Sequence, residues 1–319
     1  MQSFRLFMYL YSVNIIRHLL LLALFCSVTT VLADGTYAVI ISGGRNKMYN
    51  HERYWNDCAF LYRTLRQTFH LSKDHITLLM ADGNSPAADM LLDGGTGFVS
   101  SHTDLDGDGV PDLTQAATRQ NLSDTFHRLS GCLTASDHLF IYITDHGERT
   151  SADDVHLWLW GNDLLRPEEL ADLINLCHPA TMNIILGQCH AGAFVQPLQA
   201  EGRVITAACS ADQMSWSCKD RPYDEFVYHW TCAVAQHDEF DRPVSSDQNG
   251  DGYVTMDEAY DYACRHDRRP ETPSISSQPV ILAAQWFFSN VETNTDVQSI
   301  SNQDLQRSNI YDLQGRKRN

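Results

Sequence analysis

The sequence predicts an α/β fold in which a mostly parallel β-sheet lies between two layers of helices. Apolar runs typical of buried parallel strands alternate along the chain with amphipathic helical patterns, and several of these runs stop abruptly at polar residues. The composition agrees with one large core, because 43% of the 319 residues are hydrophobic. We therefore expect one main domain.

Five apolar segments are predicted to be strands of this sheet. They begin at Thr36 (TYAVIISGG), His75 (HITLLMADG), His138 (HLFIYITDHG), Met182 (MNIILGQC) and Arg203 (RVITAACS). Their nearly continuous hydrophobicity favours burial on both faces, as in parallel sheets. We expect the carboxyl ends of these strands to form one edge, where α/β enzymes place their chemistry.

Helical patterns lie between these strands and after the last of them. They begin at Trp55 (WNDCAFLYRTLRQTF), Thr118 (TRQNLSDTFHRLSG), Pro167 (PEELADLINL), Glu225 (EFVYHWTCAVAQ) and near Met256. The segment VHLWLWGNDLL from Val155 instead alternates apolar and polar residues around Gly161 and Asn162. This pattern predicts a short hairpin outside the main sheet.

Residues 1–33 are predicted to be a secretory signal peptide. They carry arginines but no acidic residue, and the apolar run LLLLALFCSVTTVLA places Val31 and Ala33 at the small positions of a cleavage site. A membrane anchor is the alternative, but the apolar run is short for a span. We expect cleavage after Ala33, no stable membrane insertion of the mature chain, and a secreted, periplasmic or cell-surface location.

The net charge and the cysteine content exclude some classes of partner and cofactor. Removing the two arginines of the leader changes the formal net charge from −17 to −19, which argues against nucleic acid as a partner. Eight cysteines remain, with no CxxC pair, so a zinc cluster is not expected. Disulfides can form in an exported chain, but the spacing assigns no pairs. No organic cofactor is indicated.

The last residues of the chain, 290–319, are polar and are predicted to lie outside the main domain, which spans 34–289. Within them, NIYDLQGRK from Asn309 to Lys317 is similar to the end of carboxyl-terminal sorting segments of exported bacterial proteins. We interpret it as a vestigial sorting element, with a simple disordered tail as the alternative.

Two of the predicted strands end in residues that suit nucleophilic catalysis. The strand from His138 is followed by His146 and Gly147, and the strand from Met182 is followed by Cys189. An imidazole close to a thiol can accept its proton, and the N–H groups of Gly147 and Cys189 can bind an oxyanion. Taken singly, each strand end has an alternative: the cysteine can be a small buried residue that only packs, and the histidine can be a hydrogen-bonded residue without a catalytic role. We interpret His190, directly after the thiol, as structural or wall-forming.

Several stretches resemble the legumain-like cysteine peptidases of the caspase-like clan. The matching stretches are FIYITDHGE (Phe140 to Glu148), ILGQCHAGAF (Ile185 to Phe194), SGGRNKMYNHERYWNDCAFLYRTL from Ser42, ITAACSADQMSW (Ile205 to Trp216) and DEFVYHW (Asp224 to Trp230). The resemblance implies a caspase-haemoglobinase fold, a three-layer sandwich. It also implies His146 and Cys189 as the catalytic dyad, with Gly147 in the oxyanion hole.

The resemblance further implies a substrate site beside the dyad. It places Asn50 near the catalytic histidine, and it places Arg53 and Asp224 around a pocket for the residue before the scissile bond. Ser215 and Trp216 fall in the stretch expected to contact the substrate polypeptide. A pocket with both charges suits an amide side chain, so asparagine is favoured over other residues.

One position departs from the family pattern in this pocket. The family usually has an acidic residue two positions before the nucleophile, where this chain has Gly187. The pocket preference therefore stays open between amide, acidic and basic side chains.

The segment DQNGDGYVTMDE, residues 247–258, has the pattern of a calcium-binding loop. Side-chain oxygens fall at the first, third, fifth and ninth positions, the sixth is glycine, a carbonyl is available at the seventh and a glutamate ends the loop. The predicted ligands are Asp247, Asn249, Asp251, Tyr253, Thr255 and Glu258. A solvated acidic turn is the alternative.

The segment DLDGDGVPDLTQ, residues 104–115, has the same beginning but ends in Gln115. Its predicted ligands are Asp104, Asp106, Asp108, Val110 and Asp112. Weaker calcium binding is expected here, since charge count and the bidentate twelfth ligand set the affinity. In both loops the ion would order an insertion of the domain, because oxygen ligands suit calcium and do not activate thiols.

Taken together, these patterns predict a secreted cysteine endopeptidase that forms an acyl-enzyme on Cys189 and carries structural calcium. Transpeptidation, in which an amine replaces water at the acyl-enzyme, is a close alternative. An inactive, calcium-ordered binding module on a peptidase scaffold is the alternative from another class of function. The sequence does not indicate the oligomeric state.

Overall fold

The structure is a computed structural model that describes residues 35–113, 115–151 and 154–288. The predictions for the signal peptide and for the polar tail fall outside these ranges. Within them, no helix is both long and apolar enough to cross a membrane.

The centre of the molecule is a six-stranded sheet with the order β11-β10-β9-β5-β1-β2. Its strands are β1 (Thr36–Ser42), β2 (Ile76–Met80), β5 (His138–Ile143), β9 (Thr181–Leu186), β10 (Arg203–Ala207) and β11 (Ser274–Gln278). All neighbouring pairs are parallel except β10 and β11. The five strands predicted from the sequence are the five parallel ones, so the predicted α/β fold class is confirmed.

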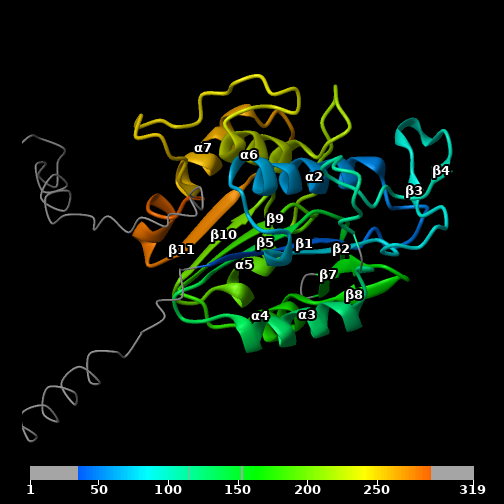
Figure 1. The fold of residues 1–319 in the computed structure, drawn as a ribbon, viewed down its shortest axis with the longest axis horizontal. Coiled ribbons are helices and arrows are strands. Elements are labelled where there is room, and N and C mark those ends of the chain that lie inside the picture. Colours follow the sequence, from blue (N-terminus) through cyan, green and yellow to red (C-terminus); the bar gives the residue numbers. More distant parts are fainter. Residues whose placement is uncertain (1–34, 114, 152–153, 289–319) are drawn as a thin grey trace, which may run out of the picture.

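Helices cover both faces of this sheet (Figure 1). One layer contains α2 (Glu52–Arg63), α6 (Glu225–Ala235) and α7 (Met256–His266), and the other contains α3 (Arg119–Cys132), α4 (Pro167–Ile174) and α5 (Gly192–Leu198). Alternate side chains of a strand point to opposite faces, so Ala38 and Ile40 of β1 pack into the first layer while Val39 and Ile41 pack into the second. Two buried cores result, one on each side of the sheet.

The helix boundaries follow local capping. Thr118 accepts a hydrogen bond from the N–H of Asn121 at the start of α3. Thr255 and Glu258 form a capping box at the start of α7. One helix differs from its predicted bounds: α2 begins at Glu52 rather than at Trp55. It continues into a π-helical turn, Thr64–Thr68.

Smaller elements complete the fold, and most of them were not expected. The predicted hairpin from Val155 exists as β7 (Asp154–Leu159) and β8 (Asp163–Leu165), but a third strand, β6 (Gly147–Ser151), pairs with β7. Strands β3 (Met90–Leu91) and β4 (Phe98–Val99) form a separate pair. The antiparallel edge strand β11 was missed because SISSQ carries little apolar character.

Candidate active site

The register of the sheet places His146 and Cys189 at the same edge. Strands β5 and β9 pair in parallel, and their last paired residues are Ile143 and Leu186. His146 and Cys189 each follow their paired residue by the same number of positions, and the N–H of Gly187 continues the ladder by donating to the carbonyl of Ile143 at 2.7 Å. The predicted juxtaposition of the two residues therefore results from backbone pairing alone.

The thiol of Cys189 lies in a narrow backbone environment. The side chain is 9% exposed, and its Sγ is 3.6 Å from the carbonyl oxygen of Ser215. Burial raises the pKa of the thiol, and the N–H of Gly147, which donates toward the sulfur, opposes this rise. A Cβ on residue 147 would lie 1.9 Å from the carbonyl oxygen of Cys189, so only glycine brings its N–H this close to the sulfur.

The imidazole of His146 is held in one tautomer by a carbonyl. Its Nε2 lies 2.9 Å from the carbonyl oxygen of Tyr49, and because a carbonyl only accepts, Nε2 carries the hydrogen. The lone pair therefore lies on Nδ1. The ring packs edge-on against Tyr49, His51 and Tyr54, and burial lowers the pKa of His146, which keeps the imidazole neutral and able to accept a proton.

Two side chains around the His146 loop support this arrangement. Asp145 accepts hydrogen bonds from the backbone N–H groups of Gly44 and His146, both at 2.6 Å, and burial raises the pKa of its carboxyl to about 7. Asn50, predicted near the histidine, follows Tyr49 and donates from Nδ2 to the carbonyl of Asp89 at 3.0 Å. It thus fixes the loop whose carbonyl holds the imidazole.

The predicted pocket residues Arg53 and Asp224 form an ion pair. The Nε of Arg53 lies 2.7 Å from Oδ1 of Asp224, and its Nη2 donates to the hydroxyl of Tyr54 at 2.9 Å. The remaining guanidinium donors have no partner among the described residues. The pair therefore presents free donors next to a carboxylate, which is the arrangement that the sequence predicted for an amide ligand.

A second carboxyl, from Asp57 of α2, lies behind this pair. Thr144 Oγ1 is 3.2 Å from Oδ2 of Asp57 and 3.4 Å from Oδ2 of Asp224, and the N–H of Asp224 contacts both Asp57 oxygens. Burial and the neighbouring Asp224 carboxylate raise the pKa of Asp57 well above its ordinary value. Sequence reasoning missed Asp57, although an acid within the apolar stretch DCAFLY was a usable signal.

Gly187 has no room for the acidic side chain that the family pattern would place there. A Cβ at this position would lie 2.6 Å from Cγ1 of Val227 and 3.0 Å from the carbonyl oxygen of Ile143. The acids near Arg53 are instead Asp57 of α2 and Asp224 at the start of α6.

The segment around Ser215 and Trp216 is extended and open on one side. Trp216 donates its N–H to Oε2 of Glu271 at 3.0 Å and accepts from the N–H of Glu225 at 2.9 Å, so its backbone polar groups are used. The carbonyl of Ser215 and both backbone groups of Ser217 face the other way, and those of Ser217 have no partner among the described residues. This side of the segment can pair with an extended polypeptide.

His190 does not join the thiol and the imidazole. Its Nδ1 lies 3.1 Å from the carbonyl oxygen of Ala211, and its N–H donates to the carbonyl of Gln213. It therefore ties the turn after Cys189 to the chain after β10.

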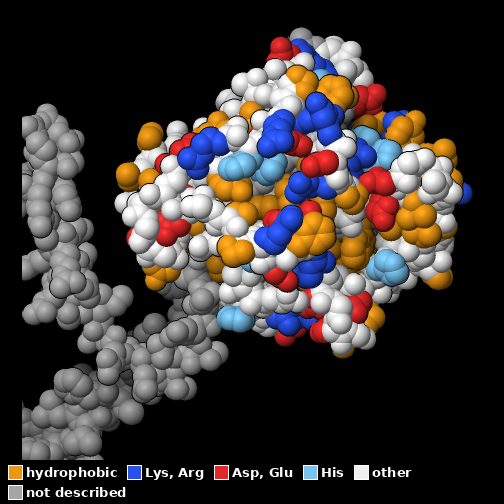
Figure 2. Space-filling view, turned by 90° about the horizontal axis from the view of Figure 1, so that it is seen from above, with side chains coloured by type: hydrophobic (Ala, Val, Ile, Leu, Met, Phe, Trp, Pro, Cys, Tyr) orange, Lys and Arg blue, Asp and Glu red, His pale blue; other side chains and the backbone are white. Residues whose placement is uncertain are grey.

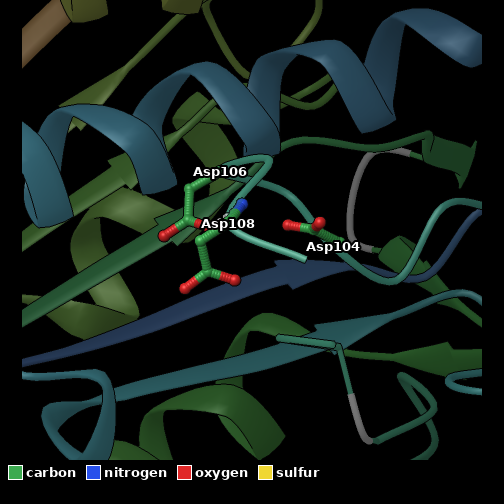
Figure 3. A group of neighbouring side chains, drawn as sticks. All are labelled: Asp104, Asp106 and Asp108. Carbon is green, nitrogen blue, oxygen red and sulfur yellow. Dashed lines mark hydrogen bonds between the residues drawn. The ribbon is translucent and has the colours of Figure 1, made fainter. Parts of the chain in front are cut away.

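The loop at 104–115 brings three of its predicted ligands together. Asp104, Asp106 and Asp108 each place an oxygen within 4.8 Å of the others, and their carboxylates surround a common space (Figure 3). Asp112 instead forms an ion pair with Lys73, with Oδ1 2.6 Å from Nζ, and it accepts hydrogen bonds from the Tyr62 hydroxyl and from the N–H of Leu105. The three carboxylates are a donor set that suits calcium, whereas Asp112, which was predicted as a ligand, is held by the ion pair and the hydrogen bonds.

The loop at 247–258 is folded around its first and last acids. Asp247 accepts from the N–H groups of Gly250 and Gly252, while Glu258 Oε1 accepts from Gln248 and Asn249. Glu258 thus holds the backbone of the loop through Oε1, while its Oε2 accepts from Thr255. Among the described residues, the carboxylates of Asp247, Asp251 and Glu258 are not gathered as closely as those of residues 104–108. This donor set, carboxylates with an amide and a carbonyl, also suits calcium.

All eight cysteines within the described residues are unpaired, including Cys189. The thiol at the candidate site is therefore free for chemistry.

A model of the peptidase C13 family matches residues 36–280. This range includes both sheet-edge residues, the Arg53–Asp224 pair and both acidic loops. No curated protein matches the sequence significantly.

Proposed function

The chain belongs to the peptidase C13 family of cysteine peptidases, and from this premise we propose that it is an endopeptidase in which Cys189 is the nucleophile and His146 its base. The observation that carries the proposal is the shared register of β5 and β9, which brings the two residues to one edge. The free thiol, the neutral imidazole with its lone pair on Nδ1, and the Gly147 N–H supply the remaining requirements.

The reaction then follows from these groups. His146 Nδ1 accepts the thiol proton, and the thiolate attacks the substrate carbonyl carbon while the carbonyl π electrons move to oxygen. The N–H groups of Gly147 and Cys189 stabilise this oxyanion. Collapse breaks the C–N bond, and the imidazolium returns its proton to the leaving amine. Water, deprotonated by His146, attacks the acyl-enzyme and releases the acid product and the thiol.

Substitution of the nucleophile tests the mechanism. We expect Cys189→Ala to lower kcat/KM on peptide substrates by at least about a thousandfold with unchanged thermal unfolding, since no other group supplies the acyl acceptor. The matched control is Cys132→Ser, which removes an exposed thiol of α3 and should leave activity intact. Cleavage by a pure Cys189→Ala sample at the wild-type rate would overturn the mechanism.

We further propose that the Arg53–Asp224 pair receives the side chain before the scissile bond and prefers asparagine. The free guanidinium donors suit the amide oxygen, and the Asp224 carboxylate suits the amide nitrogen. Matched peptides that differ only in Asn, Asp or Lys at this position test the preference. Faster cleavage after Lys would show instead that the carboxyls dominate the pocket.

The fate of the acyl-enzyme separates hydrolysis from transpeptidation. We favour hydrolysis, and mass spectrometry of products formed with an added amine nucleophile tests it, because a transpeptidase would yield the amide. An inactive binding module is the third outcome. Faster labelling of Cys189 than of Cys132 by iodoacetamide at mildly acidic pH would argue against that module.

We also propose that calcium binds both acidic loops in a structural role. The carboxylates at 104–108 and the loop closed by Glu258 support this. Chelation with EGTA is expected to lower the unfolding temperature, and added calcium should restore it. Asp104→Asn and Asp247→Asn should each remove part of the effect, while Asp172→Asn on α4 serves as the control. Equal unfolding temperatures with and without calcium would contradict the proposal.

The location of the mature protein is proposed to be outside the cytoplasm, following export through the predicted signal peptide. Mass spectrometry of the mature amino terminus tests this, with Asp34 expected as the first residue. The carboxyl terminus in the same spectrum decides whether the residues after 289 are retained.

A further inference from the structure

A basic pocket lies on the outer side of α6, apart from the thiol. It has a volume of about 390 Å³, and Lys219, Arg221, Arg268 and Arg269 provide its cationic lining. Only two carboxylates line it, although the chain as a whole has a formal charge of −17. Lys and Arg side chains also gather, with histidines beside them, across the face that carries α2, α6 and α7 (Figure 2). Positive charge is therefore concentrated locally on an acidic protein.

Three of these four cations form no ion pair within the described residues, although the charges of Asp267 and Asp220 act on Arg269 and Arg268 over a longer distance. Arg221 is paired, because its guanidinium lies 3.2 Å from Asp220 and 3.5 Å from Glu239. Lys219, Arg268 and Arg269 have no carboxylate oxygen within 4.0 Å in the ranges that the structure describes. The Nε of Arg269 is in addition buried with no hydrogen-bond partner. An incoming anion would supply the acceptor that these groups lack.

The other lining groups are compatible with an anion. Glu225 is already engaged, since its Oε1 accepts from the N–H of Arg268 at 3.1 Å and lies 3.7 Å from Nε2 of His229. Burial lowers the pKa of His229 to about 4, and the nearby His266, Arg221 and Arg268 lower it as well. Asp220 acts in the opposite direction. His229 is thus neutral near pH 7, and the Lys and Arg side chains carry the positive charge.

We propose that this pocket binds a multiply charged oxyanion, a phosphate or a polycarboxylate, through Lys219, Arg268 and Arg269. Arginine and lysine are the side chains that bind such groups by charge-assisted hydrogen bonds. The oxyanion is either a free ion or an acidic group of the polypeptide that occupies the cleft.

The pocket also connects to the segment that faces the cleft. The guanidinium of Arg269 lies 5.2 Å from the ring centre of Trp216, whose N–H is held by Glu271. An anion that fixes Arg269 therefore also restrains Trp216 at the cleft wall. This connection rests on the proposed peptidase function, whereas binding of the oxyanion does not.

Binding is tested first on the inactive Cys189→Ala protein, so that no turnover interferes. The probes are inorganic phosphate and citrate, and the readout is the NMR signal of the His229 ring, assigned with His229→Gln. A bound anion changes the charge around the ring, so titration with either probe at about pH 7.5, where both are multiply charged, should shift the His229 signal until it saturates.

Removing two of the cations tests the proposed ligands. Lys219→Gln combined with Arg268→Gln should weaken binding about tenfold or more, since each lost contact is a charge-assisted hydrogen bond. Arg265→Gln is the matched control, because Arg265 lies on the exposed side of α7 and does not line the pocket. No change in the His229 signal with either probe, or equal affinity of the double variant and the wild type, would overturn the proposal.

A pair of peptides then identifies the source of the oxyanion. They differ only in Glu or Gln three residues before the cleaved bond. If the substrate carries the anion, wild type should cleave the Glu peptide about tenfold faster, phosphate should compete, and the double variant should cleave both alike. If wild type cleaves the Glu and Gln peptides at equal rates and phosphate still binds with saturation, the oxyanion in the pocket is a free ion and not part of the substrate. Failure to cleave either peptide would count against the peptidase function, while the phosphate titration would still decide the pocket.

Discussion

The thiol–imidazole pair and the pocket beside it are built by different means. His146 and Cys189 are placed by strand register, and the polar groups that contact them are backbone groups, the Tyr49 carbonyl for His146 and the Ser215 carbonyl and Gly147 N–H for Cys189. The pocket is a side-chain assembly in which Arg53 and Asp224 come from different elements. The activity that depends on His146 and Cys189 should therefore be sensitive to changes of the backbone. The substrate preference that depends on Arg53 and Asp224 should be sensitive to changes of charge.

The largest effect is expected from Gly147→Ala. The new Cβ would lie 1.9 Å from the carbonyl oxygen of Cys189, so the backbone at residue 147 or at Cys189, the proposed nucleophile, must move. Since one oxyanion donor alone supplies a factor of about 10² to 10³, we expect kcat/KM to fall by at least about a thousandfold. Steady-state kinetics on a short peptide measures this.

Gly131→Ala is the matched control for this change. Gly131 lies in α3, where an added Cβ meets no atom within 4 Å, so alanine should stabilise the helix by about 0.5–1 kcal/mol and leave the rate unchanged. If Gly147→Ala folds, as judged by circular dichroism, and retains wild-type activity, the backbone account of the catalytic centre is wrong.

A smaller effect is expected from Arg53→Gln, which separates the two regions. The change removes the ion pair with Asp224 but no group that contacts the thiol. Loss of a charge-assisted contact should lower kcat/KM for an asparagine peptide about 10- to 100-fold. Alkylation of Cys189 by iodoacetamide should change much less than peptide cleavage, because Arg53 makes no contact with the thiol and the charges of Arg53 and Asp224 act on His146 and Cys189 only over a longer distance.

Arg166→Gln controls for the loss of one positive charge. Arg166 pairs with Asp154 at the surface, and exposed pairs of this kind contribute little to stability. A parallel fall in peptide cleavage and alkylation for Arg53→Gln would show that pocket and thiol do not act as separate units.

The same contrast explains how much the sequence revealed. The five parallel strands, and the placement of His146 and Cys189 at one edge of the sheet, follow from hydrophobic runs and their ends, which are local features. The carbonyl of Tyr49 had no signal, because any residue supplies a carbonyl. Asp57 was missed because its role depends on Thr144, which is far away in the chain. Gly187 marked a departure from the family pattern, but only the position of Val227 explains it.

The smallest effect on activity is expected from Asp57→Asn. The Thr144 hydroxyl lies between the carboxyls of Asp57 and Asp224 and has one proton, so it can donate to only one of them. The other contact becomes a hydrogen bond only if that carboxyl is protonated and donates to the hydroxyl oxygen. A proton on Asp57 completes this chain, in agreement with its raised pKa. Asparagine also offers an N–H there, so cleavage of an asparagine peptide should change by no more than about twofold.

The difference in free energy of unfolding between the Asp57→Asn variant and wild type should nevertheless depend on pH. The folded pKa of Asp57 is raised, so between its unfolded and folded pKa values the folded protein keeps a proton that the unfolded chain has lost. Wild type therefore loses stability as pH rises through this window, whereas the amide of the variant does not titrate. Urea unfolding should show that the variant is close to wild type near pH 4 and gains on it toward pH 7. A constant difference across this range would show that Asp57 is ionised in the folded protein.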